Sequence, residues 1–89
     1  MLNKLSIIIP AYNEASTIHL ILNKIKEVQL VNGIKKEIII IDDFSNDNSQ
    51  KVIKNYIDSN GTLNIQFIQH DENKGKGAAL RTGINKANR

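Results

Sequence analysis

Three groups of polar side chains in this chain have the types and spacing that ligand-binding chemistry needs, and each group follows an apolar run. The groups are Tyr12-Asn13-Glu14, Asp42-Asp43 with Ser45, and Lys74-Gly75-Lys76-Gly77. Carboxylates accept hydrogen bonds from a base or a ribose, and lysines beside a helix amino terminus attract phosphate. Together, the three groups would suit a nucleotide.

Each group also has a simpler explanation. Asn13, Glu14 and Ser16 could do no more than cap a helix, and Tyr12 could be a surface aromatic that covers the edge of a sheet. Asp42 could cap a turn while a neighbouring polar residue caps the helix that follows. A cap needs one polar side chain, however, and five of them crowd the turn after the second apolar run. We therefore expect more than capping at this turn.

Other binding motifs are weak or missing. His19 and His70 have no second ligand at metal-binding spacing, so neither predicts a metal site. Gly75-Lys76-Gly77 resembles a dinucleotide fingerprint only faintly, because it follows the third apolar run and Leu80 takes the place of the final glycine. The Gly-x-x-x-x-Gly-Lys-Ser/Thr spacing of a P-loop does not occur in the sequence.

The second apolar run is the clearest structural element. Ile38 to Ile41 are four consecutive β-branched residues between charges, which predicts a strand buried on both faces, as in a parallel sheet. Asp42 and Asp43 stand at its carboxyl end, which is where open α/β sheets bind their ligands.

Strands and helices are predicted to alternate along the chain. The strands run from Lys4 to Pro10, from about Lys36 to Asp42 and from Leu63 to Gln69, and the helices run from about Ser16 to Leu30, Asp47 to Ser59 and Ala78 to Ala87. Pro10 should end the first strand, and Asn32-Gly33 and Gly61 should end the first two helices. The helix residues expected to face the sheet are Ile18, Ile21, Leu22, Ile25 and Val28, then Val52, Ile53, Tyr56 and Ile57, and last Ala79, Leu80 and Ile84.

This alternation predicts an α/β fold of three layers, β-α-β-α-β-α, with a parallel sheet in the middle. Right-handed crossovers in one direction give the strand order 3-2-1 and open all three strand-to-helix turns on one rim of the sheet. The alternating pattern of the third strand also favours an edge position. The strand from Lys4 to Pro10 lies at the other edge without an inward charge or a bulge signal, so we expect a homodimer through this edge, or aggregation.

Composition narrows the class of protein. The 89 residues predict a single domain, 1–89, and the net charge of +3 with only two Phe and two Tyr argues against a nucleic-acid partner. The absence of cysteine excludes disulfides and thiolate metal sites. Because neither a signal peptide nor an apolar run of membrane length is recognised, we expect a cytoplasmic location.

The sequence resembles the opening of a family 2 glycosyltransferase, most closely the dolichyl- or polyprenyl-phosphate mannosyl- and glucosyltransferase group. Three segments carry the resemblance, in the same order and at similar spacing, and together they span nearly the whole chain. They are Ser6-Ile7-Ile8-Ile9-Pro10-Ala11-Tyr12-Asn13-Glu14, Ile40-Ile41-Asp42-Asp43-Phe44-Ser45-Asn46-Asp47-Asn48-Ser49, and Asn73-Lys74-Gly75-Lys76-Gly77-Ala78-Ala79-Leu80-Arg81-Thr82-Gly83.

The resemblance implies the amino-terminal half of a GT-A fold that binds a nucleoside-diphosphate sugar, either a UDP-sugar or a GDP-sugar. It implies that Asp43 accepts a hydrogen bond from the base, that Asp42 supports the same turn, and that Lys76 approaches the base or the diphosphate. By the same analogy, the nucleoside pocket is lined by Pro10, Ala11, Tyr12 and Glu14, with the Tyr12 ring near the base, while Ser45 shapes the second loop.

The sequence departs from this family in extent. Such enzymes continue into an Asp-x-Asp motif that holds a divalent cation, Mg or Mn, and into an acceptor half with a catalytic base, and no Asp-x-Asp occurs in these 89 residues. We therefore expect the donor-binding part of an inverting glycosyltransferase acting on a polyprenyl phosphate or a glycan, with no catalytic residue and no metal ligand of its own and inactive in isolation. A membrane or lipid acceptor would be met only through the missing carboxyl-terminal part. The alternative is a non-catalytic α/β nucleotide-binding or interaction module.

Overall fold

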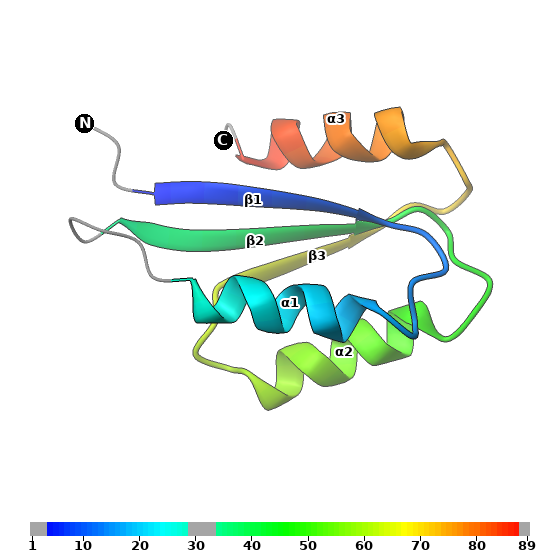
Figure 1. Cartoon of the computed structure of the whole chain (residues 1–89). Coiled ribbons are helices and arrows are strands. Elements are labelled where there is room, and N and C mark those ends of the chain that lie inside the picture. The colour runs from blue at the N-terminus through cyan, green and yellow to red at the C-terminus, as the bar shows by residue number, and fades with distance from the viewer. Residues whose placement is uncertain (1–3, 29–33, 88–89) are drawn as a thin grey trace.

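The computed structural model describes residues 4–28 and 34–87 and contains three strands and three helices in strict alternation (Figure 1). The strands are β1 (Lys4–Ala11), β2 (Lys35–Asp42) and β3 (Ile65–Gln69), and the helices are α1 (Ile18–Glu27), α2 (Ser49–Ser59) and α3 (Lys76–Ala87). The predicted β-α-β-α-β-α order is confirmed.

The three strands form one parallel sheet with β2 in the middle. Ile8 of β1 is in register with Ile39 of β2, which in turn is in register with Gln66 of β3. The neighbour order β1-β2-β3 is the predicted 3-2-1 arrangement counted from the other side. Both edge positions are confirmed within the described residues.

Pairing of the β1 edge with a second copy stays a prediction. Sedimentation of the chain would refute it by showing a stable monomer at high concentration.

Helices cover both faces of the sheet and make three layers. Figure 1 shows α1 and α2 together on one face and α3 alone on the other. The larger cluster of buried residues lies on the α1–α2 face and includes Ile18, Leu22, Ile38, Ile40 and Ile53. The smaller cluster, of Ile39, Ile41 and Ala79, lies under α3. The isoleucines of β2 thus alternate between the two cores and are at most 1% exposed, as a strand buried on both faces requires.

Pro10 does not end the first strand, which continues to Ala11. The backbone N–H of Asp43 donates to the carbonyl of Ala11 at 2.8 Å, so Ala11 turns its polar groups toward β2. Because polar groups alternate in direction along a strand, the nitrogen of Pro10 faces the free edge. A proline there removes no bond from the ladder.

The first two helices begin later than predicted. α1 begins at Ile18 instead of Ser16, and α2 begins at Ser49 instead of Asp47, because Asp47 lies before the helix and accepts the Ser49 backbone N–H at 2.8 Å. Gly61 was expected to end α2 in a left-handed conformation, and this is wrong. Asn60 follows the last turn with φ −130° and donates its side-chain amide to the Tyr56 carbonyl.

The end of α1 is held by a side chain from the sheet. Lys36 Nζ donates to the carbonyls of Ile25 at 2.7 Å and Lys26 at 3.1 Å, and also to that of Val28. A cation at this position satisfies carbonyls that the helix leaves open and opposes the negative end of its dipole. The predicted stop at Asn32-Gly33 lies outside the described residues.

Several residues predicted to face the sheet do not. On α1, Ile18 and Leu22 are buried and Ile25 packs on the core, but Ile21 and Val28 are 40% and 50% exposed. On α2 all four predicted residues, Val52, Ile53, Tyr56 and Ile57, are confirmed. The α1 core face is therefore narrower than the sequence pattern indicates.

The prediction of which residues face the sheet differs most from the structure on α3. Leu80 and Ile84 are 36% and 47% exposed, whereas Ala79 and Gly83 are buried against the sheet. Small residues bring this helix close to β1 and β2. A Cβ at position 83 would clash with the Ile8 side chain and lie 2.8 Å from Ile41 Cδ1.

A polar cluster crosses all three strands on the α3 face. Glu37 of β2 is 5% exposed and accepts from Ser6 of β1 at 3.0 Å and from Gln66 of β3 at 2.8 Å. Lys4 Nζ lies 3.5 Å from the same carboxylate. Burial acts to raise the pKa of Glu37, but the hydrogen bonds from Ser6 and Gln66 and the charge of Lys4 outweigh it, so the pKa is lowered.

Two glycines of α3 should respond oppositely to alanine. Gly83→Ala should lower the free energy of unfolding by roughly 1–3 kcal/mol because the new Cβ would overlap the Ile8 side chain and lie 2.8 Å from Ile41 Cδ1, so the packing of α3 on the sheet must shift. Gly77→Ala should raise it by up to about 1 kcal/mol, because the nearest atom to the new methyl group is Arg81 Nη1 at 3.7 Å and alanine favours the helix. Urea unfolding of both variants is the measurement, and shifts in the same direction would contradict the close packing at Gly83.

The Glu37 cluster should make stability depend on pH. Because the folded-state pKa is lowered from its ordinary value of 4.5, the ionised group stabilises the fold above pH 4.5, and this contribution is lost as the pH falls through the lower folded value. Glu37→Gln should cost roughly 1–3 kcal/mol at pH 7, and the gap to the parent should shrink below about pH 4. A gap in unfolding free energy that stays constant down to pH 3 would exclude this role.

Candidate active site

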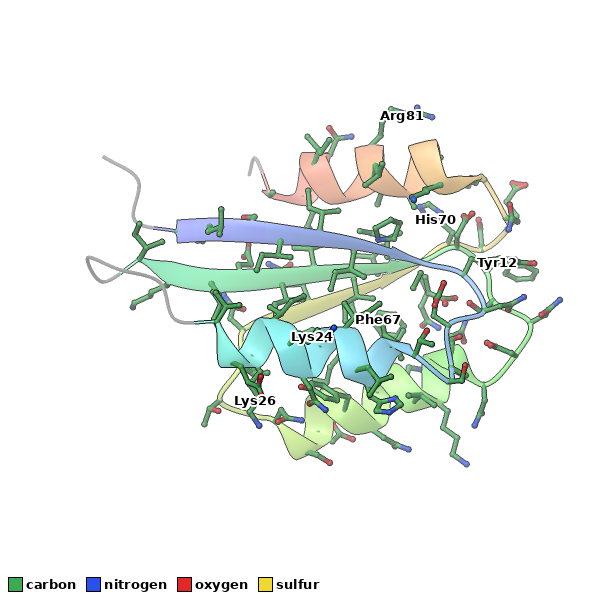
Figure 2. All side chains as sticks on the ribbon, in the orientation of Figure 1. Tyr12, Lys24, Lys26, Phe67, His70 and Arg81 are labelled. Carbon is green, nitrogen blue, oxygen red and sulfur yellow. The ribbon has the colours of Figure 1, made fainter. Side chains whose placement is uncertain are left out.

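The three strand-to-helix loops meet at the carboxyl ends of the strands, as predicted. We call them the first loop (residues 12–17), the second loop (residues 43–48) and the third loop (residues 70–75). Each follows one strand and leads into one helix. In Figure 2, Tyr12 and His70 both lie at this end of the sheet, although they come from different loops.

The first and second loops are joined by hydrogen bonds from backbone amides. The N–H of Asn13 donates to Ser45 Oγ at 2.9 Å, and Asn13 Oδ1 accepts from the N–H of Asn46 at 3.0 Å. The N–H of Glu14 donates to Ser49 Oγ at 2.7 Å, at the start of α2. Thr17, the N-cap residue of α1, makes no side-chain capping bond. The bonds of Asn13 and Glu14 instead fix the position of the first loop against the second loop and the start of α2.

Asp42 holds the second loop from inside. Its side chain is fully buried and accepts from the backbone N–H of Ser45 at 3.0 Å, from Ser45 Oγ, and from Gln50 Nε2 at 3.0 Å. These partners all lie on the second loop or α2. Asp42 thus supports the turn.

Asp43 connects the second loop to the third. Its Oδ1 accepts from the N–H of Lys74 at 2.9 Å and from His70 Nδ1 at 2.8 Å, and its Oδ2 accepts from the N–H of Gly75 at 2.8 Å. The residue is 4% exposed. Burial acts to raise the pKa of Asp43, but the hydrogen bonds from His70, Lys74 and Gly75 outweigh it, so the pKa is lowered and the group is ionised at neutral pH.

One residue in each loop has a left-handed backbone. These are Asn13 with φ 53°, Phe44 with φ 62° and Gly75 with φ 90°. Asparagine tolerates this region and glycine favours it, so Gly75 can turn its N–H onto Asp43 without a side-chain clash. Phe44 is the unusual member because a bulky residue adopts this conformation at a cost of about 1–2 kcal/mol. The residue is half exposed, at 52%.

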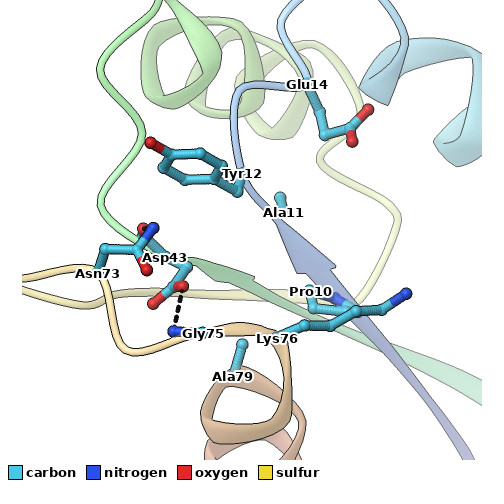
Figure 3. A pocket seen from close by; sticks show the side chains of 9 residues that line it. All are labelled: Pro10, Ala11, Tyr12, Glu14, Asp43, Asn73, Gly75, Lys76 and Ala79. Atoms are coloured by element: carbon cyan, nitrogen blue, oxygen red, sulfur yellow. Dashed lines mark hydrogen bonds between the residues drawn. The ribbon is translucent and has the colours of Figure 1, made fainter.

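A cavity of about 340 Å³ opens between the end of β1, the three loops and the start of α3 (Figure 3). Its volume is in the range of small-molecule sites. In Figure 3, Tyr12, Asn73 and Asp43 lie on one side of the cavity, and Glu14 and Lys76 lie on the other. The lining residues are Pro10, Ala11, Tyr12, Glu14, Asp43, Asn73, Gly75, Lys76 and Ala79.

The residues predicted for the nucleotide site are Pro10, Ala11, Tyr12, Glu14, Asp42, Asp43 and Lys76, and all but Asp42 line this cavity. Asp42 does not line it, and its buried side chain holds the second loop instead. Asn73 and Ala79, which line the cavity, and His70, which contacts Asp43, were not predicted for the site. The spacing of Asn73 two residues before Gly75 was a usable signal, but nothing in the sequence indicated that His70 would meet Asp43.

Charges of both signs face the cavity. Glu14 and Asp43 are acidic, and Lys76 is an exposed cation at the first residue of α3. Within residues 4–28 and 34–87, no group of three or more His, Cys, Asp or Glu side chains is placed to hold a metal ion. No helix in this part of the chain is long and apolar enough to span a membrane.

Comparisons with known proteins agree with this geometry. Residues 6–89 match Glycosyl transferase family 2. The dolichyl-phosphate beta-glucosyltransferase of Dictyostelium discoideum is 37% identical over 87 residues, which cover 90% of this chain and 26% of that protein. A poly-beta-1,6-N-acetyl-D-glucosamine synthase of Staphylococcus aureus is 35% identical over 86 residues, covering 97% of this chain and 19% of the synthase.

A solved structure is similar over nearly the whole chain. The mannosyltransferase PcManGT of Pyrobaculum calidifontis, in complex with GDP-Man and Mn2+, has a TM-score of 0.84 and 25% identity, covering 94% of this chain and 24% of its own. This chain spans about a quarter of the length of such relatives. The family match, the GT-A-like fold and the cavity at the carboxyl ends of the strands together show that the chain belongs to glycosyltransferase family 2.

Proposed function

We propose that this chain forms the donor-binding part of an inverting glycosyltransferase, which takes a sugar from a nucleoside-diphosphate sugar, UDP- or GDP-linked, and transfers it to a polyprenyl phosphate or a glycan. The observation that carries the proposal is the Asp43 carboxylate, ionised and fixed in the wall of the cavity. The bound GDP-Man of the Pyrobaculum calidifontis enzyme supports a nucleotide-sugar donor.

Asp43 has one hydrogen-bonding position left for a ligand. A carboxylate oxygen has two lone pairs, and both on Oδ1 are used by His70 and Lys74. Oδ2 accepts from the N–H of Gly75 and keeps one lone pair. A ring N–H of a base such as uracil or guanine is a donor that this oxygen can accept. The Tyr12 ring, 45% exposed at the same side of the cavity, offers a face for the base.

The other side of the cavity suits the diphosphate. Lys76 is the first residue of α3, so its ammonium lies beside the positive end of the helix dipole. Both favour an anion, and no ion pair occupies Lys76 among the described residues. Pro10 and Ala11 then form the floor of the nucleoside pocket, and Glu14 can accept from a hydroxyl of the ribose or sugar.

In the proposed reaction, an acceptor hydroxyl or lipid phosphate attacks the anomeric carbon and the nucleoside diphosphate leaves from the opposite face. The described residues bind and orient the donor. A divalent cation, Mg or Mn, would neutralise charge on the leaving diphosphate, and we place its ligands and the catalytic base outside this chain, since the residues around the cavity do not form a metal-binding cluster. We propose a cytoplasmic location for this part.

Asp43→Asn tests the donor site. In the full-length gene product it should weaken binding of UDP or GDP by roughly 1.5–3 kcal/mol, because the free lone pair on Oδ2 is replaced by an N–H that cannot accept. Isothermal titration calorimetry with UDP and GDP separately is the measurement. Asp58→Asn, on the exposed side of α2, changes the same charge far from the cavity and should leave the affinity unchanged.

Unchanged affinity in a folded Asp43→Asn protein would remove Asp43 from the site. Failure of the parent to bind UDP and GDP, alone or as sugar conjugates, would contradict the proposed function as a whole. That outcome would favour a module that does not bind nucleotide sugars.

A further inference from the structure

His70 is a buried histidine that connects three parts of the molecule. It follows the last residue of β3, is 9% exposed, and its backbone N–H donates to the Asp42 carbonyl at 2.8 Å. Its Nδ1 lies 2.8 Å from Asp43 Oδ1, and its Nε2 lies 2.9 Å from Thr82 Oγ1 on α3. Figure 2 shows His70 between α3 and the end of the sheet.

The hydrogen on Nδ1 can be assigned from its partner. The ionised Asp43 carboxylate only accepts, so Nδ1 carries a hydrogen and donates it to Oδ1. On the other side of the ring, Thr82 Oγ1 also lies 3.0 Å from the Ala78 carbonyl. The hydroxyl can donate to Nε2, or it can donate to Ala78 while Nε2 donates to it. Either arrangement leaves both ring nitrogens occupied.

His70 cannot touch a ligand in the cavity. It is absent from the lining residues, and both of its nitrogens face protein atoms. Metal binding is equally unsupported, because no metal-holding group of side chains includes it in the described residues. The direct side-chain contact between His70 and a residue of the cavity is the one with Asp43.

The consequence for Asp43 is geometric. Among the described residues, His70 supplies the one side-chain donor on this carboxylate, and the other two donors are the backbone amides of Lys74 and Gly75. Without a donor from His70, the carboxylate is held by two backbone amides alone and can tilt about its χ2 angle. The free lone pair of Oδ2 would then lose its fixed direction into the cavity.

We propose that His70 is a positioning residue of the donor site: held by Thr82 of α3, it fixes the Asp43 carboxylate so that Oδ2 presents its free lone pair to the nucleotide while Gly75 stays bound. The inference rests on the proposed function of the cavity. It also adds α3 residues behind the pocket to the elements that determine nucleotide affinity.

A pair of substitutions at position 70 separates positioning from simple packing. In His70→Asn the side-chain amide can place an N–H near the position of Nδ1, whereas in His70→Gln it reaches the position of Nε2 and leaves Asp43 Oδ1 without its side-chain donor. UDP and GDP are each titrated into the full-length gene product by calorimetry. His70→Asn should stay within about threefold of the parent, and His70→Gln should bind about tenfold or more weakly.

His19→Gln is the matched control, because His19 is exposed on α1, away from the cavity, and its replacement should leave affinity unchanged. Equal affinity in His70→Asn and His70→Gln, whether weak or unchanged, would overturn the proposal, since a packing role does not distinguish the two amides. Should His70→Gln fail to fold, Thr82→Val and Thr82→Ser replace it. Thr82→Val should weaken nucleotide binding by about threefold or more, whereas Thr82→Ser keeps the hydroxyl and should bind as the parent does. Equal affinities in the two variants would overturn the proposal.

A ligand-free measurement separates this inference from the proposed function. The Gly75 amide proton, bonded to a carboxylate, should resonate downfield in the NMR spectrum of the parent and of His70→Asn, and should move upfield in His70→Gln. A Gly75 signal that His70→Gln does not move would overturn the positioning role. If the parent binds neither UDP nor GDP but the Gly75 signal behaves as expected, the proposed function fails while the positioning of Asp43 stands.

Discussion

The Asp43 carboxylate is the contact on which the cavity at the carboxyl ends of the strands depends. The three loops at the carboxyl ends of the strands have little regular structure, and the third loop reaches the second mainly through this one side chain. Two backbone amides and one imidazole converge on it, which outweighs the cost of burying its charge and lowers its pKa. The loop bound in this way brings Asn73 and Gly75 to the cavity and sets the start of α3, where Lys76 stands.

Asp42 and Asp43 have different roles because successive side chains along a strand point to opposite faces of the sheet. Asp42 follows Ile38 and Ile40 toward α2 and binds Ser45 and Gln50. Asp43 faces the α3 side. Asp42 therefore fixes the second loop and Asp43 fixes the third. Of these two carboxylates, only Asp43 borders the cavity.

Much of this architecture could be predicted from the sequence. The isoleucine run of β2 and the alternation of strands and helices gave a strong signal for a parallel sheet, and its topology places the three polar groups on one rim. The close packing of α3 could not be predicted, because hydrophobic periodicity favours Leu80 and Ile84, whereas the observed contact depends on Gly83 having no side chain. β1 continues past Pro10 because the nitrogen of this proline faces the free edge of the sheet. Phe44 adopts a left-handed backbone conformation that bulky residues disfavour. The His70–Asp43 contact joins residues 27 apart in sequence and leaves no local pattern.

The most direct test of this account is a crystal structure of the full-length gene product with UDP or GDP bound. The account predicts that a ring N–H of the base lies within hydrogen-bond distance of Asp43 Oδ2, that the Gly75 N–H still donates to the same oxygen, and that the Tyr12 ring lies against the base. A nucleotide bound away from this cavity, or an Asp43 carboxylate turned away from Gly75 in the complex, would contradict it.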